Sequence, residues 1–398
     1  MMAEIPDHPL LVQFRDNPYP LYRQLHATAP VQWNDVLEAW TLARYADVMF
    51  SLTDPRFSAD RSIQPADSSW VAKSMLVSDP PDHTRLRALV QKAFTPRMID
   101  QLRPRIIAII GELLDRVAER DGQFDLIADL AYPLPVVVIA ELLGVPSEDR
   151  SVFHEWSALL AASLDPLVSP ELMQRVLPAR EALHTYLRGI IAERRREPKS
   201  DLISALVSVE EPTLKRGASG DALSEPELVV MCTLLLIAGH ETTVNLIGNG
   251  MLALLQHRDQ YERLQRSPEL IGTAVEELLR FDSPVQMTGR LLTEPVEIGG
   301  HSMQAGDWVL PLLGAANHDP LQFPDPDRLD IGRNPNPHVA FGRGIHFCLG
   351  APLARVEGQL AIGALLRRFP NLELAGEPVR RNQITLRGLS SLPVSVLD

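Results

Sequence analysis

A lone cysteine near the end of the chain lies in a glycine-rich stretch directly before an apolar helical pattern. The stretch is Phe-Gly-Arg-Gly-Ile-His-Phe-Cys-Leu-Gly, residues 341–350, and apolar residues at helical spacing follow it up to Phe369. Cys348 therefore stands at a helix N-terminus, where unpaired N–H groups and the helix dipole favour a thiolate over a thiol. No second cysteine or histidine stands at zinc spacing, so this thiolate suits the single protein ligand of a metal in a macrocycle. The simpler alternative is that Cys348 is a small buried apolar residue.

A carboxylic acid and a hydroxyl interrupt a long apolar helix. Glu241 and Thr242 follow a nearly continuous apolar run at residues 229–238. A buried carboxylate is costly unless it has a role, and this favours a chemical function for the pair. The alternative for Thr242 is a hydrogen bond from its hydroxyl to a carbonyl one turn earlier in the helix.

Two further pairs of charged or titratable residues lie at helical spacing. His83 and Arg87 are four residues apart, so they share one face of a helix that two prolines open. Such a pair is most often part of a solvated surface. Glu277 and Arg280 are three residues apart, and on their own they are a weak signal because such pairs are common on surfaces.

The run of fixed positions at residues 341–350 resembles the haem-binding loop of the cytochrome P450 family, and the resemblance covers most of the chain. In that family the cysteine thiolate is the proximal ligand of the iron of haem b, which implies this role for Cys348.

Residues 238–243 resemble the oxygen-binding motif of the same family. The resemblance implies that the small residues Ala238 and Gly239 leave room for dioxygen beside the helix. It also implies that Thr242 holds a water molecule near the oxygen and that Glu241 relays protons from solvent.

The resemblance also assigns the residues around the two haem propionates, which are implied to be His83, Arg87, Arg290 and His346. Arginine presents a planar, permanently charged fork to a carboxylate, which is the chemistry that a buried propionate needs. This chain has His83 where many relatives carry tryptophan. Glu277 and Arg280 match the Glu-x-x-Arg pair of the family, whose implied role is to hold the segment 319–337.

The whole chain is predicted to fold as one mainly α domain with small β-sheets, the cytochrome P450 fold. Its 398 residues are 45% hydrophobic and 22% charged, and no linker, repeat or low-complexity run divides them, so we assign residues 1–398 to a single domain. Helices are expected at 18–30, at 45–52, between 106 and 196, at 224–257 and after 351. Strands are expected at 31–34, 39–43, 290–313 and 372–397, and the resemblance adds one at 283–287. The irregular segment 54–78 is expected to roof the substrate pocket, and residues 164–177 to form a mobile lid.

The composition argues against several classes of protein. A net charge of −13 disfavours nucleic acid or an anionic membrane as the main partner. The only two cysteines, Cys232 and Cys348, imply no disulfide framework and fit a reducing cytoplasm, with Cys232 expected to serve packing. The N-terminal residues show no basic region followed by an apolar stretch, and the apolar run before Glu241 is too short to span a bilayer. We therefore expect a soluble, cytoplasmic, monomeric protein.

The resemblance implies a monooxygenase that inserts one atom of O₂ into an apolar small molecule, by hydroxylation or epoxidation. Electrons would come from NAD(P)H through a ferredoxin reductase and a ferredoxin, since no flavin or iron–sulfur domain is attached. An acidic ferredoxin would be attracted by arginines that the family places around the cysteine face, namely Arg97, Arg103, Arg105, Arg343 and Arg355. The apolar pocket is expected to include Leu234, Leu235, Ala238, Val285 and Met287.

Two alternative functions remain. A peroxide-driven peroxygenase would use the same haem loop, but the presence of Glu241 and Thr242 argues against it. A non-catalytic haem-binding sensor would also explain the loop, yet it gives no reason for this acid and hydroxyl.

Overall fold

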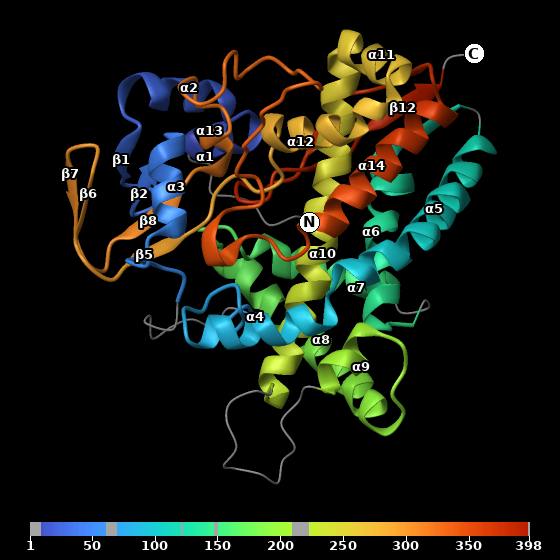
Figure 1. The fold of residues 1–398 in the computed structure, drawn as a ribbon, viewed down its shortest axis with the longest axis horizontal. Coiled ribbons are helices and arrows are strands. Elements are labelled where there is room, and N and C mark those ends of the chain that lie inside the picture. The colour runs from blue at the N-terminus through green and yellow to red at the C-terminus, as the bar shows by residue number, and fades with distance from the viewer. Residues whose placement is uncertain (1–8, 61–69, 121, 147–149, 209–222, 397–398) are drawn as a thin grey trace.

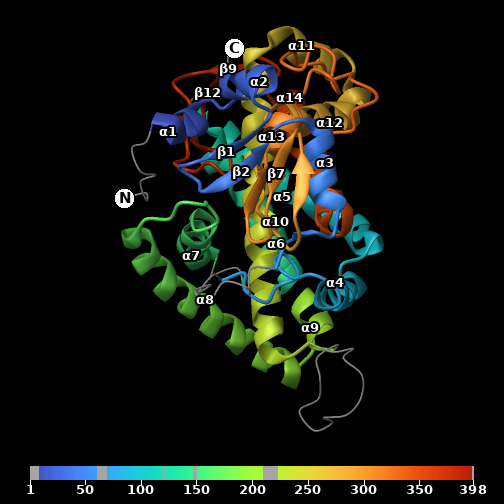
Figure 2. The same ribbon diagram turned by 90° about the vertical axis from the view of Figure 1, so that its left-hand side faces the viewer.

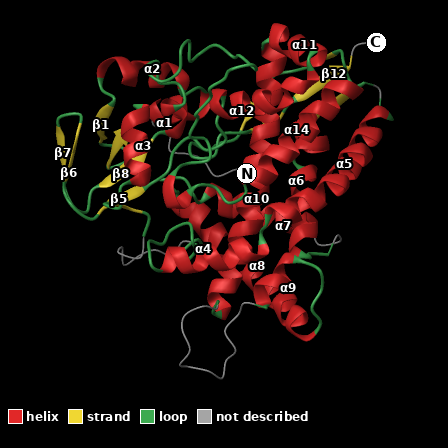
Figure 3. Cartoon of the chain, in the orientation of Figure 1, coloured by secondary structure: helices red, strands yellow, loops and turns green. Residues whose placement is uncertain are grey.

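The structure, a computed structural model, describes residues 9–60, 70–120, 122–146, 150–208 and 223–396. Helices make up most of the molecule; the largest sheet and the β6–β7 ribbon lie on one side, whereas β12 lies on the opposite side, near α11 and the C-terminus (Figures 1 and 3). The predicted class, mainly α with small β-sheets, is confirmed.

The helices are α1 (Pro9–Asp16), α2 (Tyr19–Thr28), α3 (Tyr45–Thr53), α4 (Asp82–Ala93), α5 (Pro96–Ala118), α6 (Pro133–Leu143), α7 (Arg150–Ala162), α8 (Pro170–Arg196), α9 (Leu202–Val207), α10 (Glu225–Gln256), α11 (Arg258–Arg266), α12 (Ile271–Phe281), α13 (Leu313–Ala316) and α14 (Ala351–Arg368). A π-helical turn lies at Ile127–Ala131, and 3₁₀ turns lie at Pro268–Leu270 and Gly344–His346.

The long helix α10 crosses the centre of the molecule, and the other elements pack around it (Figures 1 and 2). It begins as the sequence predicts, because the Glu227 carboxylate accepts the backbone N–H of Ser224 at 2.7 Å. By length and composition α10 could cross a membrane, but 78% of its most apolar stretch is buried inside the protein. It is therefore the core helix of this fold. Cys232 is fully buried in it, as expected for a packing residue, and burial raises the pKa of its thiol to about 12.

The strands are β1 (Val31–Asn34), β2 (Ala39–Leu42), β3 (Phe57–Ser58), β4 (Gln123–Asp125), β5 (Arg290–Leu292), β6 (Val296–Ile298), β7 (His301–Met303), β8 (Trp308–Pro311), β9 (Leu372–Leu374), β10 (Val379–Arg380), β11 (Leu389–Ser391) and β12 (Pro393–Val396). The largest sheet has the order β1-β2-β8-β5-β3, in which only β2 and β8 are parallel among the pairs described. A second sheet has the order β4-β12-β9, and β6–β7 and β10–β11 form two-stranded ribbons.

Two predicted elements are wrong or shorter than expected. Residues 283–287 form no strand but only an isolated bridge between Val285 and Leu386. The reason is local: Pro284 has no N–H to donate, so the pairing with residues 385–387 is limited to the N–H of Gln286 on the Thr385 carbonyl and the N–H of Arg387 on the Pro284 carbonyl, both at 2.9 Å. The predicted lid at 164–177 is irregular only up to residue 169, since α8 begins at Pro170. Within the predicted roof segment 54–78, residues 61–69 lie outside the described part.

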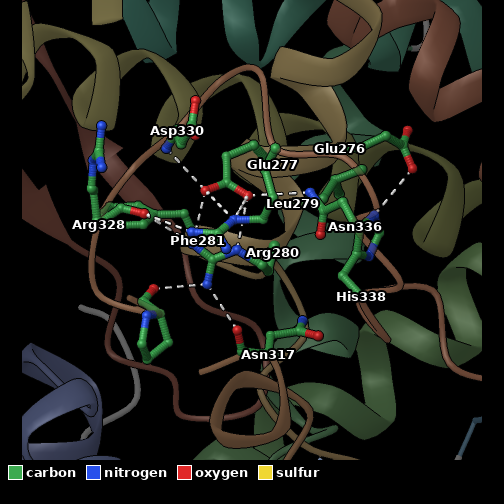
Figure 4. Close-up of polar contacts among 12 residues, drawn as sticks. Glu276, Glu277, Leu279, Arg280, Phe281, Asn317, Arg328, Asp330, Asn336 and His338 are labelled. Atoms are coloured by element: carbon green, nitrogen blue, oxygen red, sulfur yellow. Dashed lines mark hydrogen bonds and ion pairs between the residues drawn. The ribbon is translucent and has the colours of Figure 1, made fainter. Parts of the chain in front are cut away.

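A buried ion pair fixes the segment that leads to the cysteine loop. Glu277 and Arg280 on α12 are fully buried and make two hydrogen bonds of 2.8 Å to each other (Figure 4). Arg280 also donates to the carbonyls of Asn317 at 2.9 Å and Pro326 at 2.8 Å, and Glu277 accepts the N–H of Asp330 at 3.0 Å. The implied anchoring of the segment 319–337 by this pair is therefore present in the structure.

Candidate active site

The cysteine loop is a tight turn that rests against α3. Gly342 and Gly344 have φ of +68° and +69°, a region that favours glycine. At Gly344 there is a second reason against a side chain, because a Cβ would lie 2.5 Å from the Leu52 carbonyl oxygen on α3. The N–H of Cys348 donates to the Phe341 carbonyl at 3.0 Å, which closes the loop just before α14.

The sulfur of Cys348 meets the N–H groups that the sequence predicts. Although the Cys348 side chain is exposed, the protein around its sulfur is dense enough for burial to raise the pKa of the thiol. The N–H groups of Gly350 and Ala351 and the charges of Arg87 and Arg355 lower this pKa without cancelling the rise. The N–H groups at the start of α14 therefore favour the thiolate, as the sequence predicts, while burial of the sulfur opposes it.

Four predicted propionate partners come from three separate parts of the chain and lie near one another. The imidazole rings of His83 on α4 and His346 in the cysteine loop are 4.3 Å apart between centroids. Arg87, one turn after His83, donates to the Phe347 carbonyl at 2.7 Å. Burial lowers the pKa of His346 to about 3, and the nearby charges of Arg290, His83 and Arg87 add to this effect.

These side chains fit a group that carries carboxylates. Both ring nitrogens of His83 and Nε2 of His346 are buried without a hydrogen-bond partner among the described residues. Buried polar atoms of this kind need a partner, and both histidines are neutral donors beside two guanidinium groups. A thiol, two arginines and two such histidines are the donor set that a metal macrocycle with two carboxylates requires.

The predicted acid and hydroxyl lie side by side on α10 but have different surroundings. Glu241 is buried, pairs with Arg381, and lies 3.5 Å from Nε2 of His240. Burial would raise the pKa of Glu241, but Arg381 and His240 lower it to about 2, so the carboxylate is ionised. The Thr242 hydroxyl is partly exposed and donates to the Ala238 carbonyl at 3.1 Å. The structure therefore shows the local hydrogen bond that was the alternative for this threonine.

Two site residues were not found by sequence reasoning. Arg381 contacts Glu241 from the β10–β11 connection, 140 residues later, and no motif marks it. Asp165, between α7 and α8, accepts the N–H groups of Ile384 at 3.1 Å and Thr385 at 2.8 Å. These contacts join the α7–α8 connection to the segment that bridges Val285, and burial raises the pKa of Asp165 to about 6.

The residues expected to line an apolar pocket differ in exposure. Leu234, Leu235 and Met287 are buried and Val285 is partly buried. Ala238 is exposed although it lies in the middle of the buried helix α10. The helix surface at Ala238 and Thr242 is therefore accessible, as an oxygen-binding position requires.

The arginines of the predicted basic patch around the cysteine differ in whether a carboxylate lies beside them. Arg105 forms two hydrogen bonds with Glu141 (2.9 and 2.8 Å), and Arg355 forms two with Glu276 (2.7 and 2.8 Å). Arg103 lies 3.3 Å from Asp100. Arg97 and Arg343 are exposed and have no carboxylate partner in the described ranges. Carboxylates on neighbouring elements, which sequence spacing does not reveal, thus neutralise part of the group.

Comparison with known proteins agrees with this geometry. Residues 40–395 match the family model described as Cytochrome P450. The chain is 43% identical to the polyketide biosynthesis cytochrome P450 PksS of Bacillus subtilis, over 99% of this chain and 100% of that protein. It is 46% identical to the vitamin D(3) 25-hydroxylase of Pseudonocardia autotrophica, over 96% of this chain and 94% of that one. The structure of P450BioI in complex with hexadec-9Z-enoic acid ligated acyl carrier protein has a TM-score of 0.90, with 41% identity over 96% of this chain and 99% of that one.

Proposed function

Because the chain belongs to the cytochrome P450 family, we propose that Cys348 ligates its haem iron and that Glu241 and Thr242 serve its oxygen chemistry. The protein is a haem-thiolate monooxygenase that inserts one oxygen atom from O₂ into a small molecule, with electrons supplied by separate redox proteins. Haem b, when bound, supplies the dioxygen activation that no side chain provides. The observation that carries the residue assignment is the convergence of unpartnered histidine nitrogens and two arginines beside one cysteine.

The side chains around the cysteine divide the work of holding the cofactor. Arg87 and Arg290 offer charged forks to the two propionates, and His83 and His346 offer neutral N–H donors. Burying a carboxylate without such partners is costly, so these contacts fix the orientation of the macrocycle. The hydrogen bond from the Cys348 N–H to Phe341 holds the sulfur in place.

Thr242 and Glu241 serve proton delivery to dioxygen. The hydroxyl of Thr242 exchanges its hydrogen bond to the Ala238 carbonyl for one to a water molecule beside the dioxygen. Glu241 passes protons from solvent to that water. Arg381 holds the carboxylate ionised between turnovers, so that Glu241 is ready to accept the next proton.

The substrate is an extended, largely apolar small molecule that is hydroxylated or epoxidised. Supporting this class, the named relatives include a polyketide-biosynthesis protein and a vitamin D(3) hydroxylase, and one neighbour binds a fatty acyl chain on a carrier protein. Ala238, which is exposed, and Val285, which is partly buried, offer apolar surface for such a molecule. We further propose a ferredoxin with its NAD(P)H-dependent reductase as the electron source, and a monomer in the cytoplasm as the working form.

The deciding experiment measures NADH, O₂ and product together, with a ferredoxin and ferredoxin reductase supplied and with a panel of apolar substrates. We expect one product per NADH and per O₂ for a well-fitting substrate. Product formed from hydrogen peroxide alone, at a rate that NADH does not exceed, would make the protein a peroxygenase. Haem binding with no product in either assay across the panel would instead favour a sensor.

A further inference from the structure

One face of α10 carries three polar residues at intervals of one helical turn. Glu241, Asn245 and Asn249 follow each other at steps of four, so their side chains form a stripe along the helix. All three are buried, with exposed fractions of 1%, 0% and 1%. The segment of the β10–β11 ribbon covers this stripe, since two consecutive arginines of that ribbon reach it.

The residues at the two ends of the stripe, Glu241 and Asn249, have ion-pair or hydrogen-bond partners. At one end Arg381 pairs with Glu241. At the other end Arg380 donates to Oδ1 of Asn249 at 2.8 Å, and Nδ2 of Asn249 donates to the Arg387 carbonyl at 2.9 Å. Both end residues therefore have the partners that a buried polar group needs.

The middle of the stripe is different. Neither Nδ2 nor Oδ1 of Asn245 has a hydrogen-bond partner in the described part of the chain, although both atoms are buried. A buried donor or acceptor without a partner is destabilising, so two such atoms on one amide indicate that a partner is missing. Opposite the amide stands Gly388, where a Cβ would lie 1.8 Å from Oδ1 of Asn245. The chain thus keeps this contact free of a side chain, while the Gly388 carbonyl is used by the N–H of Arg381 at 3.1 Å.

We propose that Asn245 binds a buried water molecule which hydrogen-bonds to Glu241 and delivers protons to it during oxygen activation. A polar site with a free donor and a free acceptor is where proteins hold internal water, and such waters bridge groups that lack partners. Asn245 is then a positioning residue, because it acts through the water on Glu241. This inference rests on the proposed role of Glu241.

The proton balance of the step is simple. The water gives one proton to a carboxylate oxygen of Glu241 and takes one from the next water on its solvent side, so it is unchanged after each transfer. Glu241 starts as a carboxylate, as its lowered pKa indicates, and is therefore the acceptor.

A polar connection from this site towards the surface exists in the structure. Arg380, which holds Asn249, also lies 3.1 Å from the buried carboxylate of Asp282. Asp282 accepts from Arg387 at 2.7 Å, and Arg387 donates to the Arg15 carbonyl at 2.9 Å near the end of α1. These contacts thus form a chain of polar groups from Asn249, one turn after Asn245, to the Arg15 carbonyl beside the exposed Asp16.

The test replaces Asn245 by leucine, which has a similar shape but cannot hold water, and by serine, which leaves room and a hydroxyl for it. The matched control is Thr233→Val on the same helix, because the hydroxyl of Thr233 is buried and already bonded to the Val229 carbonyl at 2.9 Å. Each variant is loaded with haem and substrate. Substrate affinity, haem content, the rate of O₂ consumption and its solvent deuterium isotope effect are then measured.

We expect Asn245→Leu to keep haem and substrate affinity but to consume O₂ at least ~10-fold more slowly, with a larger solvent isotope effect; this loss is smaller than the ~10²–10⁴-fold of a direct acid or base because Asn245 acts through a water molecule. Asn245→Ser should recover most of the rate, and Thr233→Val should match the wild type. An unchanged rate and isotope effect in Asn245→Leu would overturn the inference.

A second measurement does not depend on the variants folding. A crystal structure of the wild-type haem protein should show ordered water within hydrogen-bond distance of the Asn245 amide and of Glu241. A dry amide at a resolution that shows other internal waters would refute the water site. Failure of the proposed function is distinct, because it would appear as wild-type protein that forms no product with NADH.

Discussion

Gly239, which the oxygen-binding motif assigns to making room for dioxygen, lies against a neighbouring helix. A Cβ at this position would meet Cδ1 of Ile139 on α6 at 2.8 Å. A side chain at residue 239 would have to displace Ile139, so the glycine favours the close packing of α6 on α10, whereas Ala238 supplies the accessible surface. A glycine in a motif thus combines a packing requirement with a chemical one, and only the structure separates the two.

The thiolate assignment makes a direct prediction for Cys348. The other cysteine, Cys232, is fully buried in α10, so it offers no substitute ligand. Cys348→Ser should therefore abolish the red-shifted Soret band of the reduced carbon monoxide complex, because that band requires a thiolate on the iron. Cys232→Ser is the control and should keep the band. Retention of the band in Cys348→Ser would remove the assignment on which the site rests.

The hydroxyl of Thr242 leads to a second prediction. Without this hydroxyl, the proposed water molecule beside the dioxygen loses one hydrogen-bond partner, while the Glu241–Arg381 ion pair stays intact. Thr242→Ala should bind oxygen and consume NADH near the wild-type rate but release hydrogen peroxide in place of most of the product. The ratio of product to NADH measures this effect.

A serine at the same position tests the chemistry further. Thr242→Ser keeps the hydroxyl and should restore most of the coupling. If Thr242→Ala couples NADH to product as well as the wild type does, the hydroxyl has no part in proton delivery.

Elements with strong local signals were predicted well. The capping residues Ser224 and Glu227 and the long apolar run place α10 within a residue or two of its observed ends. The first strand pair and α3 also follow from alternation and helical spacing close to their observed bounds. The prediction of a strand at residues 283–287 was wrong because Pro284 has no N–H to donate, so the pairing stops at the single bridge between Val285 and Leu386.

Contacts between elements distant in sequence could not be predicted. The partner of Glu241 is Arg381. Asp165, in the α7–α8 connection, accepts hydrogen bonds from the N–H groups of Ile384 and Thr385. In each case the two partners are at least 140 residues apart in the sequence and come together only in the complete fold. The predicted arginine group shows the same limit, since Glu141 neutralises Arg105 from another helix.

The buried pair on α12 should contribute strongly to stability. Arg280→Met removes one of the two guanidinium partners of the fully buried Glu277 carboxylate, the other being Arg333 at 3.1 Å, and leaves the carbonyls of Asn317 and Pro326 without this donor. Removing one partner of a buried ion pair typically costs about 3–5 kcal/mol. We expect a loss of this size in the free energy of unfolding by urea, together with weaker haem retention.

The matched control is Arg23→Met. Arg23 forms a 2.9 Å ion pair with Asp327 in the same segment, but both side chains are largely exposed, at 56% and 42%. Exposed pairs contribute about 0–1 kcal/mol, so this variant should remain close to the wild type. Equal losses in the two variants would mean that burial does not distinguish the pairs.

At the scale of the molecule, the segments around the site meet at the end of α7. The indole N–H of Trp70 donates to the Leu160 carbonyl at 2.8 Å, and Asp165 holds the turn before β11 a few residues later. The described part of the predicted roof, the lid connection and the C-terminal ribbon are therefore joined at one place. The family match covers residues 40–395, so the assignment of all 398 residues to one domain stays a prediction.

The last prediction concerns the electron donor, which must approach the face where the cysteine loop lies beside α3. Of the predicted arginines, Arg343 is exposed in this loop without a carboxylate partner in the part of the chain that is described, whereas Arg105 and Arg355 are paired. Against a net charge of −13, an unpaired arginine there would attract an acidic ferredoxin at long range. Reduction by ferredoxin should therefore slow as salt rises past ~0.1 M, where the Debye length falls below about 10 Å.

Charge reversal locates this attraction. Arg343→Glu should lower the association rate with ferredoxin and flatten its dependence on salt, while substrate affinity stays unchanged, because charges at the rim of an interface act mainly on association. Arg188→Glu is the control, since Arg188 is exposed on α8, which lies across the molecule from α3 (Figure 2). Stopped-flow reduction of the haem measures both rates. If Arg343→Glu behaves like Arg188→Glu at every salt concentration, the donor does not use the surface around the cysteine loop.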